Sequence, residues 1–173
     1  MDKNIIAEFE ESTTDLLKTI SSFRQEQFNL VPFEGSWTAG QVAEHLYKSE
    51  SNAIRQMKGN TKPTEKSDTD ANEKIIRLSF LNFNTKFQSP DFILPSPEPK
   101  LKEKFIKRFE KTREDIRKLI DTEDLSLTCT DFSFPGIGEI TRLEWICFVN
   151  CHSIRHTRQM NNIHNELTAQ KVL

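Results

Sequence analysis

The segment FPGIGEITRLEWICFVNCHSIRHTRQM, residues 134–160, carries the pattern that decides the fold. A turn rich in proline and glycine comes first. Thr141, followed three residues later by Glu144, is then the capping-box signature of a helix start. The pattern predicts a last helix that runs to about residue 168. Because its histidines continue the apolar stripe, we expect them to face the core. The stripe consists of Trp145, Val149, His152, His156, Met160 and Ile163.

Three more segments show the same helical periodicity and predict helices of similar length. The first spans about residues 4–28. The second begins at the N-cap Thr38, where Gln41 completes another capping box, and it ends near Gly59. The third spans about residues 98–121. The expected inward faces carry Phe9, Leu16, Ile20 and Phe23 in the first helix, Val42, His45, Leu46, Ala53 and Met57 in the second, and Leu101, Phe105, Phe109, Thr112, Ile116 and Leu119 in the third.

The connection between the second and third helices is long and has three parts. Residues 60–71 are polar and predict a solvated surface loop. A short amphipathic helix is expected next. Residues 89–99 contain four prolines and predict an extended connector that lies across the bundle. The apolar positions of the short helix are Ile76, Phe80, Phe83 and Phe87, and those of the connector, which we expect to pack inward, are Phe92, Ile93 and Leu94.

These elements predict an all-α fold. Four helices of similar length bury their apolar stripes most simply as a four-helix bundle. The connection between helices two and three then carries a short extra helix, and it is long enough to cross the bundle. A chain of 173 residues is near the common size of one domain, so we expect residues 1–173 to form a single domain.

Composition and charge indicate which kinds of binding partner and which cellular location to expect. The net charge of −2 and the isoelectric point near 6.1 predict no nucleic-acid binding. No apolar run approaches the roughly 20 residues that span a bilayer, and the acidic start lacks the pattern of a secretory signal. We therefore expect no membrane partner and a cytoplasmic location. The three cysteines show no disulfide-framework spacing. Cys147 and Cys151 are expected to be small buried residues rather than a redox or metal pair, and Cys129 is expected to stand alone in a loop.

Three of the four histidines fall on predicted inward faces. His152 and His156 lie one turn apart, so their rings project from the same side of a helix and can close on one ion. His45, from a packed neighbouring helix, would complete a three-nitrogen site with open positions. The alternative is that each ring is a core histidine bonded to protein groups. An H-x-x-x-H pair is a weak signal by itself, and this one lacks the internal glutamate of a metalloprotease. His164 is expected to be solvent-exposed or terminal.

Two segments together resemble the DinB-like superfamily. In residues 134–160 a Pro-and-Gly turn leads into a Trp-bearing helix with an H-x-x-x-H pair and a glutamine three residues later. In SWTAGQVAEHLYKSE, residues 36–50, a tryptophan precedes a helix that contains a His-Leu pair. The resemblance implies a four-helix bundle, often a homodimer. It also implies a divalent metal, zinc or nickel, held by residues that map onto His45, His152 and His156. Characterised relatives include bacillithiol- and mycothiol-dependent transferases and a mycothiol-dependent isomerase.

A three-imidazole site with an open position can ionise bound water or bind a thiolate. The resemblance favours an enzyme that takes a small-molecule substrate and transfers a low-molecular-weight thiol to an electrophile. A non-catalytic metal-binding or structural bundle and a metal-dependent hydrolase are the alternatives. Gln159 is the first choice for a residue that supports a ligand histidine, and Trp37 is either a wall of the site or a packing staple. Further candidates near the ligand turns are Glu44, Glu50, Asn150 and Arg155. Arg155 points about 100° away from His156 on the helix, so we expect it in a surface salt bridge.

Overall fold

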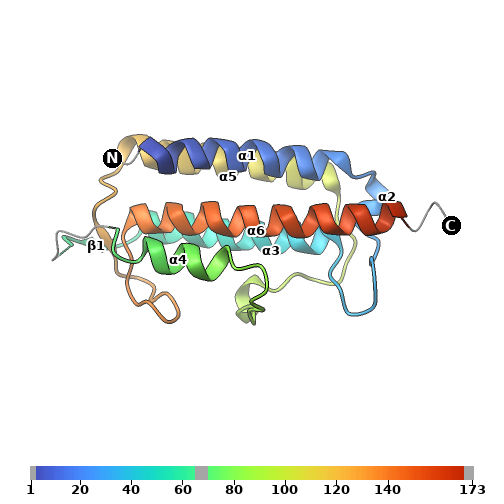
Figure 1. Cartoon of the computed structure of the whole chain (residues 1–173). Coiled ribbons are helices and arrows are strands. Elements are labelled where there is room, and N and C mark those ends of the chain that lie inside the picture. The colour runs from blue at the N-terminus through green and yellow to red at the C-terminus, as the bar shows by residue number, and fades with distance from the viewer. Residues whose placement is uncertain (1–2, 65–69, 170–173) are drawn as a thin grey trace.

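A computed structural model describes residues 3–64 and 70–169 of the protein, and four long helices in those ranges form a bundle (Figure 1). Both α1 (Lys3–Ser22) and α3 (Ala39–Lys58) pack against α5 (Lys102–Thr122) and α6 (Arg142–Ala169). Each long helix therefore has two long neighbours, as in a square arrangement. The all-α four-helix bundle predicted from the sequence is confirmed.

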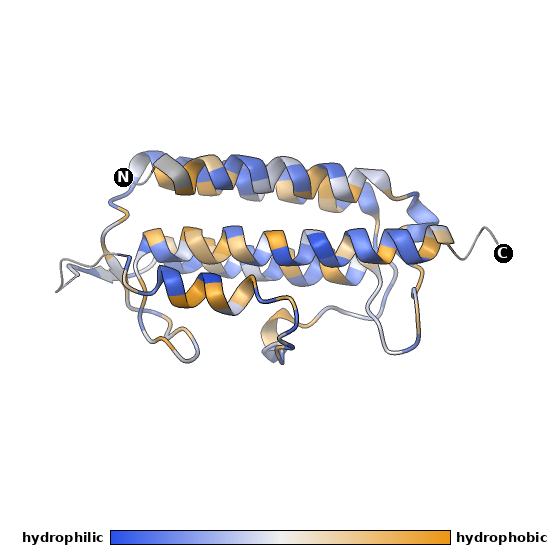
Figure 2. Cartoon of the chain, viewed as in Figure 1, coloured by the Kyte–Doolittle hydropathy of each residue, from blue (hydrophilic) through white to orange (hydrophobic). Residues whose placement is uncertain are grey.

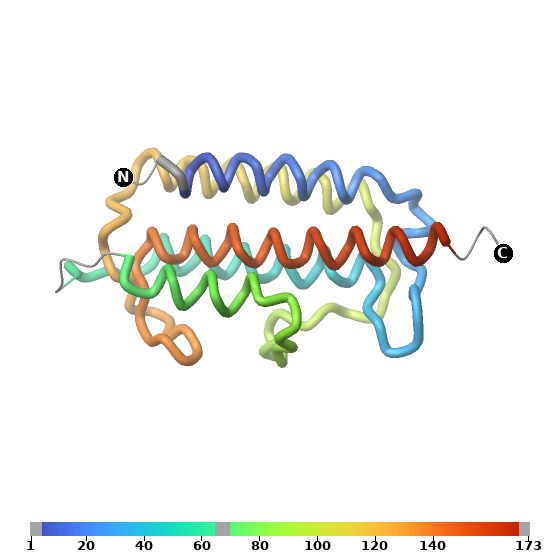
Figure 3. The backbone as a smooth tube through the Cα atoms, in the orientation of Figure 1, coloured from blue at the N-terminus to red at the C-terminus, as the bar shows by residue number. Residues whose placement is uncertain are grey.

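The chain crosses the bundle between α3 and α5. The tube in Figure 3 shows α1 and α6 running in one direction and α3 and α5 in the other. The returning connection contains α4 (Glu73–Phe80) and a 3-10 helix, η1 (Asp91–Ile93), and α4 packs on α6. Because two parallel helices follow one another in sequence, the connection must run back along the bundle. The predicted crossover with a short extra helix is therefore present.

The first predicted helix is broken. α1 ends at Ser22, and a second short helix, α2 (Gln25–Phe28), begins after Arg24, whose backbone is extended (φ −73°, ψ 155°). The Gln27 side-chain oxygen accepts the Arg24 backbone N–H at 3.1 Å and caps the new start. The prediction of one helix over residues 4–28 was therefore wrong. The bend returns the Phe28 ring to the core, 6.4 Å from the ring of Phe105.

The starts of the two histidine-bearing helices are as predicted. Thr38 Oγ1 accepts the Gln41 N–H at 3.1 Å, and the Gln41 side chain accepts the Thr38 N–H at 3.0 Å. At α6 the corresponding pair is Thr141 and Glu144, with distances of 3.1 and 2.8 Å. Gly59 is the C-cap of α3. These caps set where each helix begins, and so which residues face inward.

A two-stranded sheet joins the loops at one end of the bundle. β1 (Thr61–Lys62) pairs antiparallel with β2 (Thr128–Cys129), which was not predicted. Part of the loop expected at residues 60–71 is therefore ordered strand, and residues 65–69 lie outside the described residues. Cys129 is a buried strand residue rather than an isolated loop position. The strands are too short for sequence alternation to reveal them.

Two expectations about the connection between α3 and α5, and one about the start of α5, were wrong. α4 ends at Phe80, so Phe83 and Phe87 follow the helix instead of extending its face. Within η1 and just beyond it, only Ile93 is buried, whereas Phe92 and Leu94 are 53% and 40% exposed. The connector is a single segment of chain that lies on the surface of the bundle. Only one of these three consecutive side chains therefore points toward the core. Leu101, expected on the inner face of the third helix, is its N-cap and is 65% exposed.

The bundle interior has two apolar ends and a polar middle. One apolar cluster surrounds Trp145 near the sheet, and the other surrounds Phe28 and Phe109 near α2. Each long helix alternates apolar and polar residues along its surface (Figure 2). Between the clusters lie buried polar side chains, among which are His45, Glu50, Arg113, His152 and His156. No helix within the described ranges combines the length and apolarity that a membrane span requires.

Candidate metal centre

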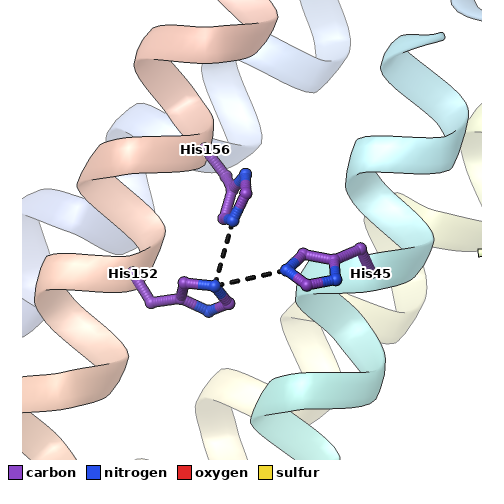
Figure 4. A group of neighbouring side chains, drawn as sticks. All are labelled: His45, His152 and His156. Carbon is purple, nitrogen blue, oxygen red and sulfur yellow. Dashed lines mark hydrogen bonds between the residues drawn. The ribbon is translucent and has the colours of Figure 1, made fainter. Parts of the chain in front are cut away.

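The three inward-facing histidines meet in the polar middle of the bundle. His45 projects from α3, and His152 and His156 project from α6, so that all three rings converge (Figure 4). The Nε2 atom of His152 lies 3.3 Å from Nε2 of His45 and 3.0 Å from Nε2 of His156. One ligand atom from each ring lies within 4.8 Å of the other two. The structure thus brings together the three histidines that the sequence singled out.

Two of the rings have their protons placed by other groups. The Nδ1–H of His45 donates to the backbone carbonyl of Ile93 at 3.1 Å. The Nδ1–H of His156 donates to the side-chain oxygen of Gln159 at 2.8 Å. A neutral imidazole carries one proton, so both Nε2 atoms present lone pairs to the centre. The sequence predicts the role of Gln159, but it cannot predict that of Ile93, because a backbone carbonyl leaves no signature in a sequence.

His152 cannot donate a hydrogen bond to the Nε2 lone pairs of both His45 and His156. A single N–H on its Nε2 can donate to His45 or to His156, and the other lone pair then stays unmatched. Within the described part of the chain, the buried Nδ1 of His152 has no hydrogen-bond partner. With the proton on Nδ1 instead, three lone pairs point at one another. In either tautomer the cluster is incomplete as a set of internal hydrogen bonds, and this costs roughly 1–3 kcal/mol for each unmatched group.

The rings are buried and neutral. His45, His152 and His156 are 3%, 6% and 8% exposed. Burial is the main cause that lowers the pKa of His45, and burial together with the two neighbouring rings lowers the pKa of His152 well below its usual value. Burial and His45 lower the pKa of His156 to about 3. Neutral imidazole is the form that binds a cation, so the site is ready for one at neutral pH.

Aromatic rings surround the cluster. The Phe148 ring stacks on His152 with centroids 5.0 Å apart and planes at 20°, and Phe80 meets the same ring edge-on at 5.7 Å. Trp37 lies 5.3 Å from His45 and is half-buried. Trp37 therefore borders the site, and it also packs against the apolar cluster around Phe28 and Phe109. These apolar surfaces lower the local dielectric and strengthen any electrostatic interaction in the centre.

The donor set fits a divalent metal. Bonds of about 2.0–2.1 Å from a tetrahedral ion to imidazole nitrogens separate those nitrogens by about 3.3 Å. The distances of 3.3 and 3.0 Å to His152 Nε2 are close to that value. One cation could accept all the converging lone pairs, and imidazole ligands suit zinc, copper, iron and nickel. The three buried histidines could therefore hold a metal ion.

Comparison with known proteins gives the same picture. The family model of the DinB superfamily matches residues 8–160. The chain belongs to the DinB superfamily. The matched region contains all three histidines of the cluster. The uncharacterized protein YuaE of Bacillus subtilis (strain 168) is 24% identical over 165 residues, which cover 92% of this chain and 96% of the relative. No solved structure gives a significant match.

Two glutamates considered as supports for this DinB-superfamily site have other partners. Glu44 forms an ion pair with Lys100 at 2.6 Å and accepts the backbone N–H of Ser96 at 2.9 Å, which anchors the connector to α3. Glu50 pairs with the guanidinium of Arg113 inside the bundle. Both are committed to contacts between helices or with the connector, so neither orients a ligand ring.

Asn150 and Arg155 also act elsewhere. The Asn150 amide donates to the carbonyl of Ile5 at 3.0 Å and joins α6 to α1. Arg155 was expected in a surface salt bridge, but its guanidinium donates to backbone carbonyls of Phe80 at 3.1 Å and Asn82 at 3.0 Å. It thereby fixes the segment that follows α4. His164 is half-buried, 5.1 Å from the ring of Phe23 and outside the cluster, so it is neither fully exposed nor a candidate ligand.

Cys147 and Cys151 are buried, as predicted, and Cys129 is buried too. All three are free thiols with no measurable exposure. Burial raises the pKa of Cys129 to about 11, and the contact with Cys151 together with burial raises the pKa of Cys147. The hydrogen bond with Cys147 lowers the pKa of Cys151, but that thiol is fully buried. A thiol that is protonated or inaccessible is a poor nucleophile. The chemistry of this chain is therefore to be sought at the histidines.

Proposed function

We propose that the protein is a divalent-metal-dependent enzyme that transfers a low-molecular-weight thiol to an electrophilic small molecule. The observation that carries the proposal is the convergence of three neutral Nε2 atoms whose lone pairs have no complete set of internal partners. His45, His152 and His156 would hold the ion, zinc or nickel. When bound there, the ion supplies positive charge that keeps a thiol ionised at neutral pH.

The chain's own residues prepare the site for this reaction. Ile93 and Gln159 hold protons on Nδ1 of His45 and His156, so the Nε2 atoms stay available. Phe148 and Trp37 exclude water from the neighbourhood of the rings. In the proposed transfer the thiol loses its proton to solvent, and its sulfur forms a bond to an electrophilic carbon as the leaving group departs. No oxidant or reductant is needed.

A non-catalytic metal-binding bundle is the second candidate, and the burial of the site favours it. The three rings are at most 8% exposed, so an ion held there would reach solvent or substrate only after side chains around it, such as Trp37 and Phe148, move. An enclosed ion would stabilise the fold outright, in the manner of structural metal sites. The two candidates therefore differ in whether a substrate can reach the bound ion.

The test begins with metal content and continues with activity. Purified protein, as isolated and after addition of zinc or nickel, is dialysed and its bound metal measured. It is then assayed with bacillithiol, mycothiol or glutathione and the electrophile monochlorobimane. We expect one equivalent of metal per chain and thiol transfer that His152→Ala abolishes. His164→Ala is the matched control, because it removes an imidazole from the same helix outside the cluster.

The outcomes separate the candidates. Binding of metal without activity on any thiol, and with a large gain in thermal stability, would favour the structural bundle. Hydrolysis of an ester by metal-loaded protein in the absence of thiol would replace transfer by a hydrolase. If the protein takes up no divalent ion at all, the proposed function is wrong.

A further inference from the structure

A groove lies along the seam between α3 and α5, lined by different residues from those of the histidine centre. Its volume is about 520 Å³. Tyr47, Ser51 and Ile54 line its α3 side. The α5 side carries the cationic residues Lys104, Lys107, Arg108 and Lys111. Lys104, Arg108 and Lys111 recur at intervals of four and three residues, so they occupy one face of the helix.

Positive charge in this groove is poorly balanced. Asp115 is the acidic residue among its lining side chains, and it pairs with Lys111 at 2.8 Å. Among the described residues, Lys104, Lys107 and Arg108 form no ion pair with a carboxylate. The protein as a whole carries a net charge of −2. A concentration of unpaired cations on an acidic protein marks a place where an anion is favoured.

Arg108 is held in position before any ligand arrives. Its guanidinium carbon lies 4.8 Å from the Tyr47 ring centre and 5.1 Å from that of Phe105. Stacking on aromatic rings restricts the side chain and leaves the N–H groups at the edge of the fork free to donate. A guanidinium held in this way can donate two parallel hydrogen bonds to the oxygen atoms of a phosphate group. The Arg108 side chain then needs little further ordering when the anion binds.

We propose that this groove binds a small soluble anion with two or three linked phosphate groups. A diphosphate or triphosphate carries about three to four negative charges at neutral pH, which matches the cations present. From Lys104 to Lys111 the helix rises about 10 Å, a length that suits such a ligand. Asp115 closes one end of the row, so the groove disfavours a longer polyanion such as a nucleic-acid strand. The proposal is independent of the metal centre.

The test is calorimetric titration with inorganic tripolyphosphate. The probe is added to the protein and, in parallel, to His152→Ala, because a polyphosphate could also bind an ion at the histidines. We expect saturable binding of one equivalent to both proteins. Lys104→Glu with Lys107→Glu should weaken it by at least about tenfold, since both cations are exposed and their removal leaves the fold intact.

A charge-matched variant makes the test specific. Lys18→Glu with Lys74→Glu changes the net charge by the same amount at exposed positions on α1 and α4. We expect this variant to bind tripolyphosphate like the unmodified protein. An equal loss in both double variants would show diffuse electrostatic attraction instead of a site. That result overturns the proposal, as does an absence of binding at millimolar tripolyphosphate or a loss of binding in His152→Ala.

Discussion

Two polar clusters lie inside the same bundle, and they differ in whether their hydrogen bonds are complete. In one, Arg113 on α5 pairs with Glu50 on α3, with one N···O distance of 3.1 Å. The same guanidinium donates to Ser153 at 2.8 Å and to Ser12 and Thr13 at 3.3 Å. Every donor group of the fork that points into the bundle has an internal acceptor. This cluster connects the four long helices, and its hydrogen bonds are complete without a ligand.

The histidine cluster has the opposite character. The outer Nδ1 atoms of His45 and His156 are satisfied by Ile93 and Gln159, whereas the Nδ1 of His152 has no partner among the described residues and the three Nε2 atoms face one another. Neutral imidazoles in this arrangement have more lone pairs than protons at the centre. Buried polar groups that satisfy one another indicate a structural role, whereas buried groups that converge with unmatched lone pairs indicate a place for a ligand.

Removal of Arg113 should have the largest effect on stability. Arg113→Met leaves the Glu50 carboxylate buried without its partner, so we expect the free energy of unfolding to fall by about 3–5 kcal/mol. Urea denaturation followed by circular dichroism measures this. The control is Arg113→Met combined with Glu50→Leu, which should recover most of the loss. A single variant as stable as the unmodified protein would contradict the structural role of this cluster.

His152→Ala should affect metal affinity most. Loss of a supporting residue typically weakens metal binding by about 10–100-fold, so loss of a ring that faces both neighbours should exceed about 100-fold. Competition titration against a zinc chelator measures the change, with His164→Ala as the control. Equal affinities for the two variants would show that the ion, if bound, sits elsewhere.

Acid should destabilise the metal-free protein. The folded state holds the pKa values of His152 and His156 below the unfolded value of about 6.5, so the unfolded chain binds more protons as the pH falls. This stability is fully present above pH about 6.5 and is lost below it. Between pH 7.5 and 5.5 we expect about 1.4 kcal/mol per histidine, or about 3 kcal/mol in total. Denaturation at the two pH values measures it, and His156→Ala should show a smaller difference.

Gln159 tests the orientation of one ring. Gln159→Leu removes the acceptor of the His156 Nδ1–H while keeping a side chain of similar size, so we expect metal affinity to fall about 10–100-fold. Gln159→Glu provides a stronger acceptor and should retain or increase affinity. If both substitutions leave the affinity unchanged, the hydrogen bond does not set the position of His156.

The smallest expected effect is at the start of α3. Thr38→Ala removes the side-chain cap of the helix that carries His45 and should lower the free energy of unfolding by about 1 kcal/mol. Thr14→Ala, at an exposed position within α1, should change it by less than about 0.5 kcal/mol. Thermal denaturation of the two variants compares them. A larger loss for Thr14→Ala would show that the cap contributes little.

Local patterns were sufficient to predict the histidine set. The capping boxes at Thr38 and Thr141 set the helix starts, and the apolar spacing then placed His45, His152 and His156 on inward faces. Gln159 could be predicted because residues three apart on a helix are neighbours. These inferences needed only the geometry of a single helix and the rule that apolar stripes face the core.

Other features depend on contacts between distant segments. The break after Ser22, the strand pairing of Thr61 with Cys129 and the exposure of Phe92 follow from how the chain packs, which periodicity does not encode. The Ile93 carbonyl could not be found in advance, because every residue has one and only the path of the connector brings this one to His45.

The sequence alone determined the fold class and the inward-facing positions of the three histidines, because helix caps and apolar spacing act within one or two turns of the chain. The tertiary structure decided which buried polar groups satisfy one another. From the sequence, Glu50 is a candidate to support the site. In the bundle it forms an ion pair with Arg113 instead, and the three histidines face one another. Pairing across a bundle depends on the relative positions of helices far apart in the chain, and only the assembled core sets those positions.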